Sequence, residues 1–421
     1  MPTEAQQTHT SGGAADATPD AGTRVLHGQS YHVAIARALY EAQKLDAHAI
    51  LAGPAAEIAH AGLLQVRDGG ESACLGAAEE GFRAAGLGRL DLSETGPGGG
   101  TASLADSLVA LGWRARHGRS AHPVCATAAG AIAGAMEAAF GRPFAVEEVE
   151  CAAQGASVGR CRFRVRPAEE GFVPVEPRPR EAAPRQPAAP PPPPGPGAEI
   201  AESLFPAPPG ADEGGRIDGP GGRFARVRAD YYPRVAQRFE REVPRAMGAK
   251  FANIPALLLT EAAHYHGFYG LGEVMRSAEW TVRARASLTT REELMHAAVA
   301  LVNRLGWGVW HVHSLVPGEQ AAVRVYESHE ALAHRVLYGR AAAPRCFLAR
   351  GTAAALMNLV FVGDLPGRPA LTPSYYNQLF RSPLSFRAVE TRCRAMDDPY
   401  CEFVINPLSA SAGVRLREAL G

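Results

Sequence analysis

The chain has 421 residues, with 43 basic and 43 acidic side chains that leave a formal net charge of zero. This length predicts two or three domains. The balanced charge argues against a protein that binds bulk nucleic acid, because that affinity comes mainly from neutralised phosphates. Hydrophobic residues make up 46% of the chain, but its 33 prolines and 45 glycines indicate that part of it buries no core.

Residues 1–25 are expected to form a disordered arm, because Met1 to Thr23 contains no apolar run. Such a segment is neither a secretory signal nor an anchor. The later apolar stretch Phe347 to Gly363 is interrupted by Arg350 and Asn358, which makes it too polar for a membrane span. We therefore expect a soluble, cytoplasmic protein.

The first folded unit is predicted to span residues 26–168. Its expected elements are a helix over Ala73–Ala85, a short strand over Arg89–Ser93, helices over Leu104–His117 and Val124–Phe140, and a hairpin over Phe144–Gln154 and Cys161–Val165. Gly96 to Gly100 is expected to form a flexible loop. Gly130 and Gly134 are expected to seat their helix against the unit's own sheet.

Residues 169–225 are predicted to be a linker rich in proline and glycine. The stretch between Gly171 and Phe224 holds 15 of the 33 prolines, including the run Pro190 to Pro194. Five consecutive prolines favour an extended polyproline helix, so the segment is expected to act as a semi-rigid spacer that buries no core. Docking of this run to an SH3-like groove is the alternative.

The second unit is predicted to span residues 226–410, with a tail over 411–421. The expected elements are helices over Tyr232–Ala246 and Arg291–Leu305, a hairpin over Trp307–Val316 and Ala321–Tyr326, helices near Ser328–Tyr338 and Cys346–Val360, and a hairpin over Phe386–Met396 and Tyr400–Ile405. Both units end alike, which indicates an internal duplication. The fold class is therefore mixed α/β (α+β), with two similar domains that each pack helices on a small antiparallel sheet.

Six of the seven cysteines follow one repeated pattern. Each unit contains a cysteine, then Glu-x-x-Cys on a predicted strand, then a cysteine that begins the returning strand. The two sets are Cys125, Glu148, Cys151 and Cys161, and Cys346, Glu390, Cys393 and Cys401. Three thiolates and a carboxylate suit structural Zn²⁺. For either set alone, the alternative is that the cysteines are simply buried free thiols. The repetition of the same cysteine and glutamate pattern in both units favours a metal site.

The strand geometry sets a condition on this metal hypothesis. Residues three apart on an ideal strand point to opposite faces, so Glu148 and Cys151 can meet one ion only if a bulge or bend intervenes. The same condition holds for Glu390 and Cys393.

These residues resemble the 4-vinyl reductase domain family. The resemblance is carried by Pro123-Val124-Cys125, Ala129-Gly130, Glu148-x-x-Cys151, Gly155 and Cys161-Arg162-Phe163, and in the second unit by Cys346, Gly351, Glu390-x-x-Cys393-x-Ala395 and Cys401-Glu402-Phe403. It implies tandem small-molecule-binding domains, as in the sensors of aromatic-responsive activators and in a protein of bacteriochlorophyll synthesis. It also implies that the two cysteine and glutamate sets hold structural zinc.

The spacing of the cysteine and glutamate residues differs between the two units in two places. Nine residues lie between Cys151 and Cys161 but seven between Cys393 and Cys401. The second unit also has 43 residues between Cys346 and Glu390, against 22 between Cys125 and Glu148, which predicts an insertion around Asp364 to Pro383.

Aromatic and histidine residues of the second unit supply material for a ligand chamber. We expect His296, Trp310 and Tyr326 to line it, with Trp113, Arg116 and His117 as candidates in the first unit. Core and surface packing is the simpler explanation for each of them.

No dinucleotide fingerprint, nucleophile elbow, Walker loop or His-Glu-x-x-His motif is present in the sequence. The sequence therefore favours a non-enzymatic sensor or scaffold that binds a small apolar or aromatic ligand and acts through a protein partner, with dimerisation possible. One alternative is a tetrapyrrole carrier or reductase-associated protein of pigment synthesis. The other is a protein-interaction adaptor without a ligand.

Overall fold

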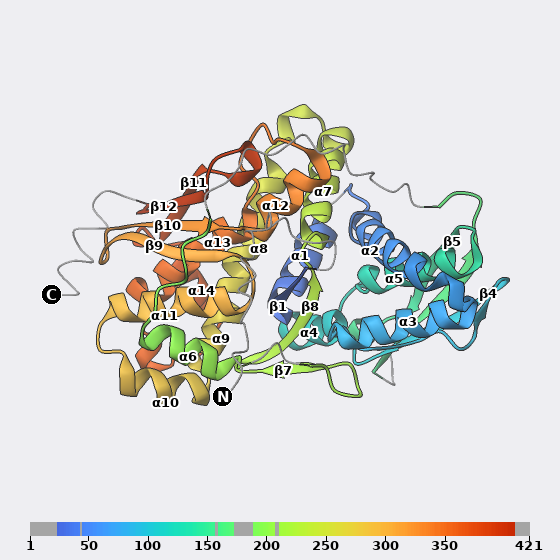
Figure 1. The fold of residues 1–421 in the computed structure, drawn as a ribbon, viewed down its shortest axis with the longest axis horizontal. Helices are drawn as coiled ribbons and strands as arrows, with labels where there is room; N and C mark the ends of the chain where they lie inside the picture. Colours follow the sequence, from blue (N-terminus) through green and yellow to red (C-terminus); the bar gives the residue numbers. More distant parts are fainter. Residues whose placement is uncertain (1–22, 43, 156–158, 172–187, 207–209, 409–421) are drawn as a thin grey trace, which may run out of the picture.

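The computed structural model describes residues 23–42, 44–155, 159–171, 188–206 and 210–408. The chain forms two lobes, with the first unit on the right of Figure 1 and the second on the left. Each lobe packs helices on a small antiparallel sheet, which confirms the predicted fold class. Most of the predicted arm (1–22) and all of the predicted tail (411–421) lie outside the described residues.

The sheet of the first unit has the strand order β2-β4-β6-β5, and the short β3 pairs with β4. These strands are β2 (Arg89–Asp91), β3 (Thr95–Gly96), β4 (Gly99–Ala105), β5 (Phe144–Glu150) and β6 (Arg160–Pro167). The helices are α2 (Ala47–Leu63), α3 (Glu71–Ala84), α4 (Leu108–His117) and α5 (Ala126–Phe140).

The sequence prediction was wrong at both ends of β4. Leu104 and Ala105 belong to this strand instead of a helix, and the expected loop at Gly96 to Gly100 is a β3–β4 turn. Glycine makes that turn possible: at Gly100, whose φ is 142°, an added Cβ would lie 2.1 Å from a carbonyl oxygen.

The sheet of the second unit has the corresponding order β9-β10-β12-β11. Its strands are β9 (Val309–Val316), β10 (Gln320–Tyr326), β11 (Phe386–Arg392) and β12 (Cys401–Pro407). The helices are α8 (Ile254–His266), α9 (Gly272–Arg276), α10 (Ala278–Ser287), α11 (Arg291–Arg304), α12 (His329–Tyr338), α13 (Phe347–Met357) and α14 (Pro373–Phe380). Helix α14 lies in the predicted insertion.

Each unit packs its glycine-containing core helix against another helix. A Cβ at Gly130 or Gly134 of α5 would lie 2.0 or 2.3 Å from the carbonyl oxygens of Ala52 or Ala56 in α2. These glycines therefore seat α5 on a helix, and not on the sheet as expected. Gly351 of α13 approaches α8 in the same way, because a Cβ added there would lie 2.5 Å from the Thr260 carbonyl oxygen.

The segment Ala47–Gly69, which contains α2, is long and apolar enough to cross a membrane. In the most apolar 18-residue stretch of this segment, 44% is buried inside the structure. It also carries the buried Glu57, whose carboxylate pairs with Arg234 at 2.7 Å and with Arg238. A packed core helix passes the same test of length and composition, so the segment is weak evidence for a membrane span.

The two units are joined by a sheet to which both contribute. Strand β1 (Arg24–Gly28) pairs with β8 (Gly222–Arg228), which also pairs with β7 (Ile217–Gly219). Helix α1 (Gln29–Glu41) packs on α8, and α7 (Tyr231–Met247) packs on α2. Figure 1 shows β1, β8, α1 and α7 between the two lobes.

The expectation that residues 169–225 bury no core is wrong for their second part. Helix α6 (Pro196–Leu204) packs on α11 in the second lobe, and its Ile200 and Ala201 are buried. Ile217 and Phe224 are buried as well. Proline at the first helical position is compatible with a helix, so a proline-rich composition did not prevent one from forming after the proline run.

Candidate metal centres

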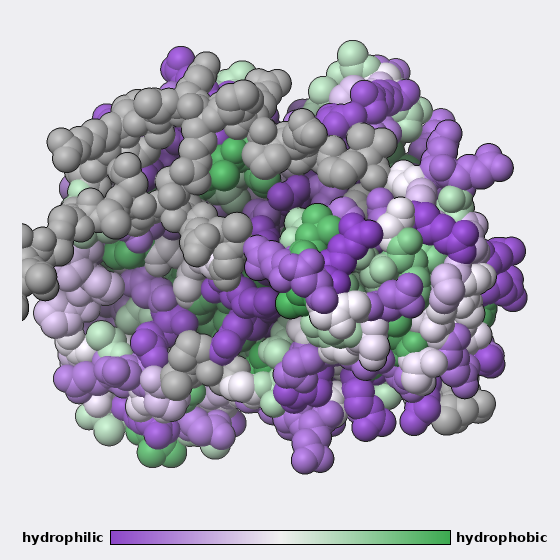
Figure 2. Space-filling model, turned by 45° about the vertical axis from the view of Figure 1, so that its right-hand side comes forward, coloured by the Kyte–Doolittle hydropathy of each residue, from purple (hydrophilic) through white to green (hydrophobic). Residues whose placement is uncertain are grey.

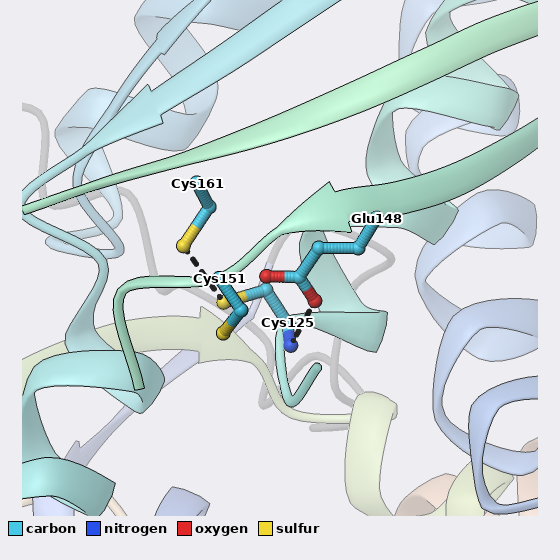
Figure 3. A group of neighbouring side chains, drawn as sticks. All are labelled: Cys125, Glu148, Cys151 and Cys161. Carbon is cyan, nitrogen blue, oxygen red and sulfur yellow. Dashed lines mark hydrogen bonds between the residues drawn. The ribbon is translucent and has the colours of Figure 1, made fainter. Parts of the chain in front are cut away.

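Four side chains of the first unit point toward one another at the end of its hairpin (Figure 3). Cys125 immediately precedes α5, Glu148 lies on β5, Cys151 follows β5, and Cys161 lies on β6. One ligand atom from each lies within 4.8 Å of all the others, and the Cys125 and Cys161 sulfurs are 3.5 Å apart. All three thiols are buried, and Glu148 is only 8% exposed.

The second unit repeats this arrangement. Cys346 precedes α13, Glu390 lies on β11, Cys393 follows β11, and Cys401 begins β12. Their ligand atoms meet the same limit of 4.8 Å, and the Cys346 and Cys401 sulfurs are 3.4 Å apart. The structure therefore brings together the four residues of each sequence pattern, and metal binding by them stays a prediction.

A bulge brings Glu and Cys onto one side of each hairpin. The register of β5 with β6 shifts between Glu148 and Glu150, and that of β11 with β12 shifts between Glu390 and Arg392. A short 3₁₀ turn follows each of the middle cysteines Cys151 and Cys393. The bulge that the metal hypothesis required is therefore present in both units.

Backbone and hydroxyl groups support the sulfurs. The amide of Ala152 donates to Cys161 Sγ at 3.4 Å, and the amide of Arg394 donates to Cys401 Sγ at 3.3 Å. Ser107 Oγ lies 3.2 Å from Cys125 Sγ, and Ser328 Oγ lies 3.3 Å from Cys346 Sγ. The sequence interpretation missed these two serines, although each stands 18 residues before the first cysteine of its set.

The glutamates use one oxygen for the backbone and leave the other free. Glu148 Oε2 accepts from the Cys125 amide at 2.7 Å, and Glu390 Oε2 accepts from the Cys346 amide at 3.1 Å. The Oε1 atom of each is buried, with no hydrogen-bond partner among the described residues. An unpaired buried acceptor beside three thiols fits a bound cation.

Crowding of ionisable groups shows why a cation suits these clusters. Burial, and then Cys151, raises the pKa of Glu148 to about 8. Hydrogen bonds from Cys125 and Cys161 lower the pKa of Cys151 to about 2. The cluster thus tolerates little negative charge by itself, whereas a bound divalent ion would favour thiolates and carboxylate together.

The residues predicted to line a ligand chamber do not converge. His296 is exposed on α11, whereas Trp310 is fully buried and stacks on Phe403 at a ring distance of 6.3 Å. Tyr326 instead contacts His311 and Tyr400. Because neighbouring strand positions alternate between faces, Trp310 and His311 point apart, and Tyr326 lies with His311.

The candidates of the first unit contact the second unit. Arg116 lies over the ring of Tyr269 at 3.8 Å, and His117 Nε2 is 3.3 Å from the Tyr265 hydroxyl. Trp113 is buried and packs edge-on against His117. These residues therefore join α4 to the α8 region.

Two hollows in the described part of the chain are small or polar. One of about 10 Å³ is lined by residues such as Glu240 and Arg345, and an open one of about 190 Å³ by residues such as Glu79, Arg89 and Asp91. Neither involves Trp310. On the face in Figure 2, hydrophobic areas are scattered between hydrophilic ones.

The hairpin with its cysteine cluster is also the part of the chain that a family comparison finds. Residues 113–167 match the 4-vinyl reductase domain, the family that the motifs resemble. The matched residues include Cys125, Glu148, Cys151 and Cys161 and lie in the first unit, so a second domain of this family stays a prediction. No curated protein matches the chain.

A solved structure is also similar to the chain. It is the phenol-responsive sensory domain of the transcription activator PoxR, in a crystal structure with phenol. The identity is 15%, the TM-score is 0.36, and the alignment covers 52% of this chain and 94% of that domain. At this level of similarity nothing about ligands follows for the present protein.

Proposed function

We propose that this protein is a non-enzymatic small-molecule sensor or scaffold, built from two units of the 4-vinyl reductase type that each hold a structural zinc ion. The observation that carries the proposal is the duplicated cluster of three cysteines and a glutamate, which fastens the hairpin to α5 in one unit and to α13 in the other. The family match over the first cluster supports the assignment. Signalling through a protein partner in the cytoplasm belongs to this proposal.

Metal content tests the proposal directly. We expect about two zinc ions per chain in protein purified without chelators, because each cluster offers a closed set of four ligands. Cys161→Ser and Cys401→Ser should each remove one ion and lower the melting temperature, since binding of structural zinc contributes to folding. Elemental analysis and thermal unfolding measure both effects.

The seventh cysteine provides a matched control. Cys74 is also fully buried, but its sulfur contacts only the Leu63 carbonyl, at 3.7 Å, among the hydrogen-bond partners in the described chain. Cys74→Ser should therefore retain both ions. Zinc-free wild-type protein, or equal metal loss in all three variants, would contradict the zinc sites.

The adaptor remains a second candidate, because Trp310 is fully buried and stacks on Phe403, and neither of the two hollows described above is lined by it. The two functions differ in their response to small aromatic compounds. A sensor should show a ligand-dependent rise in melting temperature, since ligand binding stabilises the folded state. A panel of phenols and other small aromatics that leaves the melting temperature of the zinc-loaded protein unchanged would favour the adaptor.

A further inference from the structure

Strands β1 and β8 pair in a symmetric register. Arg24 lies opposite Arg228 at one end of the pairing, and Gly28 lies opposite Phe224 at the other. Exchanging residues that are 200 positions apart turns the first of these pairs into the second, as Arg24 and Phe224 show. The two units therefore enter the shared sheet in the same way.

The helices that follow these strands keep the same offset. Three buried positions of α1 recur 200 residues later in α7, where Tyr31, Ile35 and Leu39 correspond to Tyr231, Val235 and Phe239. Helix α1 packs on α8 of the second unit, and α7 packs on α2 of the first. We call β1 with α1 (24–41) and β8 with α7 (222–247) the exchanged segments, because each lies on a helix of the other unit.

Helices α2 and α8 correspond as well. Gly130 and Gly351 each stand five residues after the first cysteine of their cluster. A Cβ at Gly130 would lie 2.0 Å from the Ala52 carbonyl oxygen, and one at Gly351 would lie 2.5 Å from the Thr260 carbonyl oxygen. Ala52 and Thr260 are 208 positions apart. Residues at this offset therefore occupy equivalent places on the two helices.

The contact of α7 with α2 contains buried charges. Glu57 of α2 is only 5% exposed, and its carboxylate pairs with Arg234 at 2.7 Å and with Arg238. Gly53 leaves room for these side chains, because an added Cβ would lie 2.7 Å from the guanidinium carbon of Arg238. Asp230 also pairs with Arg234, at 3.1 Å. Both arginines reach Glu57 from the second exchanged segment, so these ion pairs join the two units.

The equivalent contact of α1 with α8 lacks these charges. At the offset of 208, Tyr265 stands in the place of Glu57. At the offset of 200, Ala34 and Ala38 stand in the places of the two arginines. The two contacts thus use equivalent elements with different side-chain chemistry.

This difference penalises the pairing of two first units from separate chains. Such a pair would lay Ala34 and Ala38 of one copy on α2 of the other, and Glu57 would be buried without its two arginines. Removing one side of a buried ion pair is strongly destabilising, because an uncompensated charge stays behind. Every pair of first units also leaves a pair of second units over, so this penalty alone favours unlike pairs.

We propose that Glu57, Arg234 and Arg238 select the pairing of unlike units. The surface of α2 around Glu57 accepts an exchanged segment that carries two arginines four positions apart, as α7 does, and rejects the segment that contains α1. Two copies of the chain therefore do not pair through their first units, and each molecule keeps one unit of each kind. This inference does not depend on the proposed metal sites.

Refolding of a cleaved chain tests the selection, because cutting removes the tether that raises the effective concentration of the two halves. A protease site inserted between Gly171 and Ala188 yields a first and a second half, which are unfolded together in urea and refolded with zinc. We expect native mass spectrometry of the wild type to show pairs of one first and one second half, and no pairs of two first halves.

Glu57→Gln removes the carboxylate that a pair of first halves would bury without a partner. It should raise the ratio of first-half pairs to mixed pairs by at least about tenfold. Glu80→Gln is the matched control, because Glu80 pairs at 2.7 Å with Arg83 of its own helix. This control should leave the ratio unchanged.

An apolar variant keeps the test decisive if Glu57→Gln fails to fold. Glu57→Met combined with Arg234→Leu and Arg238→Leu replaces the whole charged group, a change that buried ion pairs often tolerate without loss of stability. It should also form pairs of first halves. The proposal is overturned if the wild type forms such pairs, if its halves stay single, if Glu57→Gln and the apolar variant form mixed pairs only, or if Glu80→Gln raises the ratio as Glu57→Gln does.

Discussion

His117 links the two units, and burial keeps its imidazole neutral. Its Nδ1 lies 3.3 Å from Arg37 Nη1, and its Nε2 lies 3.3 Å from the Tyr265 hydroxyl. Burial, and then the charges of Arg37 and Arg116, lowers the pKa of His117 to about 4, although Glu41 opposes this shift. In an unfolded chain the pKa of histidine is about 6.5.

A prediction about pH follows from the sign of this shift. Between about pH 6.5 and pH 4 the unfolded chain binds a proton at position 117 that the folded chain does not, so stability is lost as the pH falls through this window. His117→Gln should reduce the decrease in the urea midpoint between about pH 7 and pH 5. Other buried histidines contribute to the wild-type decrease, so the comparison is between the two proteins. Identical decreases would contradict the assignment.

At the scale of helices, α5 depends on glycine where it meets α2. A methyl group at Gly130 would lie 2.0 Å from the carbonyl oxygen of Ala52. Gly130→Ala should therefore lower the free energy of unfolding by about 1–3 kcal/mol, the usual cost of overpacking.

Gly76 of α3 is the matched control, because an added Cβ there meets nothing within 4 Å. Gly76→Ala should raise stability by about 0.5–1 kcal/mol in the same urea titration, and a gain at both positions would exclude close packing of α5 on α2.

The elements that the sequence predicted well carry local signals. Helix α11 begins with a capping box at Thr290 and Glu293, and the Glu-x-x-Cys pattern marks both hairpins, so both could be recognised within a few residues. Strand β1 has only five residues and pairs with β8, from Arg24 opposite Arg228 to Gly28 opposite Phe224. Such a strand is specified by a partner far along the chain, which local patterns do not reveal.

The same limit explains the sites. Three cysteines and a glutamate indicate a metal cluster because their residue types are rare and their spacing repeats. The buried ring of His27 contacts His32 and His329, residues with no common spacing, because the fold packs together parts of the chain that are far apart in sequence. The predicted chamber residues failed for the converse reason, since His296, Trp310 and Tyr326 are close in sequence but lie on different faces.

In the whole molecule, the units exchange contacts across the β1–β8 sheet. Arg234 of α7 reaches Glu57 of α2 in the other unit, and α1 packs on α8. Buried Val25 and Val227 face each other in the pairing of β1 with β8. These contacts do not depend on the covalent connection through residues 172–187, so the units should behave as one cooperative body and not as two independent domains.

Cutting that connection tests the view. A protease site inserted between Gly171 and Ala188 should yield two fragments that still elute together in gel filtration and unfold in a single thermal transition, because the interface is buried and continuous. Val25→Asp in the same cleavable chain is the control. It places a carboxylate opposite Val227, where burial of an unpaired charge is costly, so these fragments should separate after cleavage. Separation of the fragments of the otherwise unaltered chain would show that the connecting segment, and not the shared sheet, holds the units together.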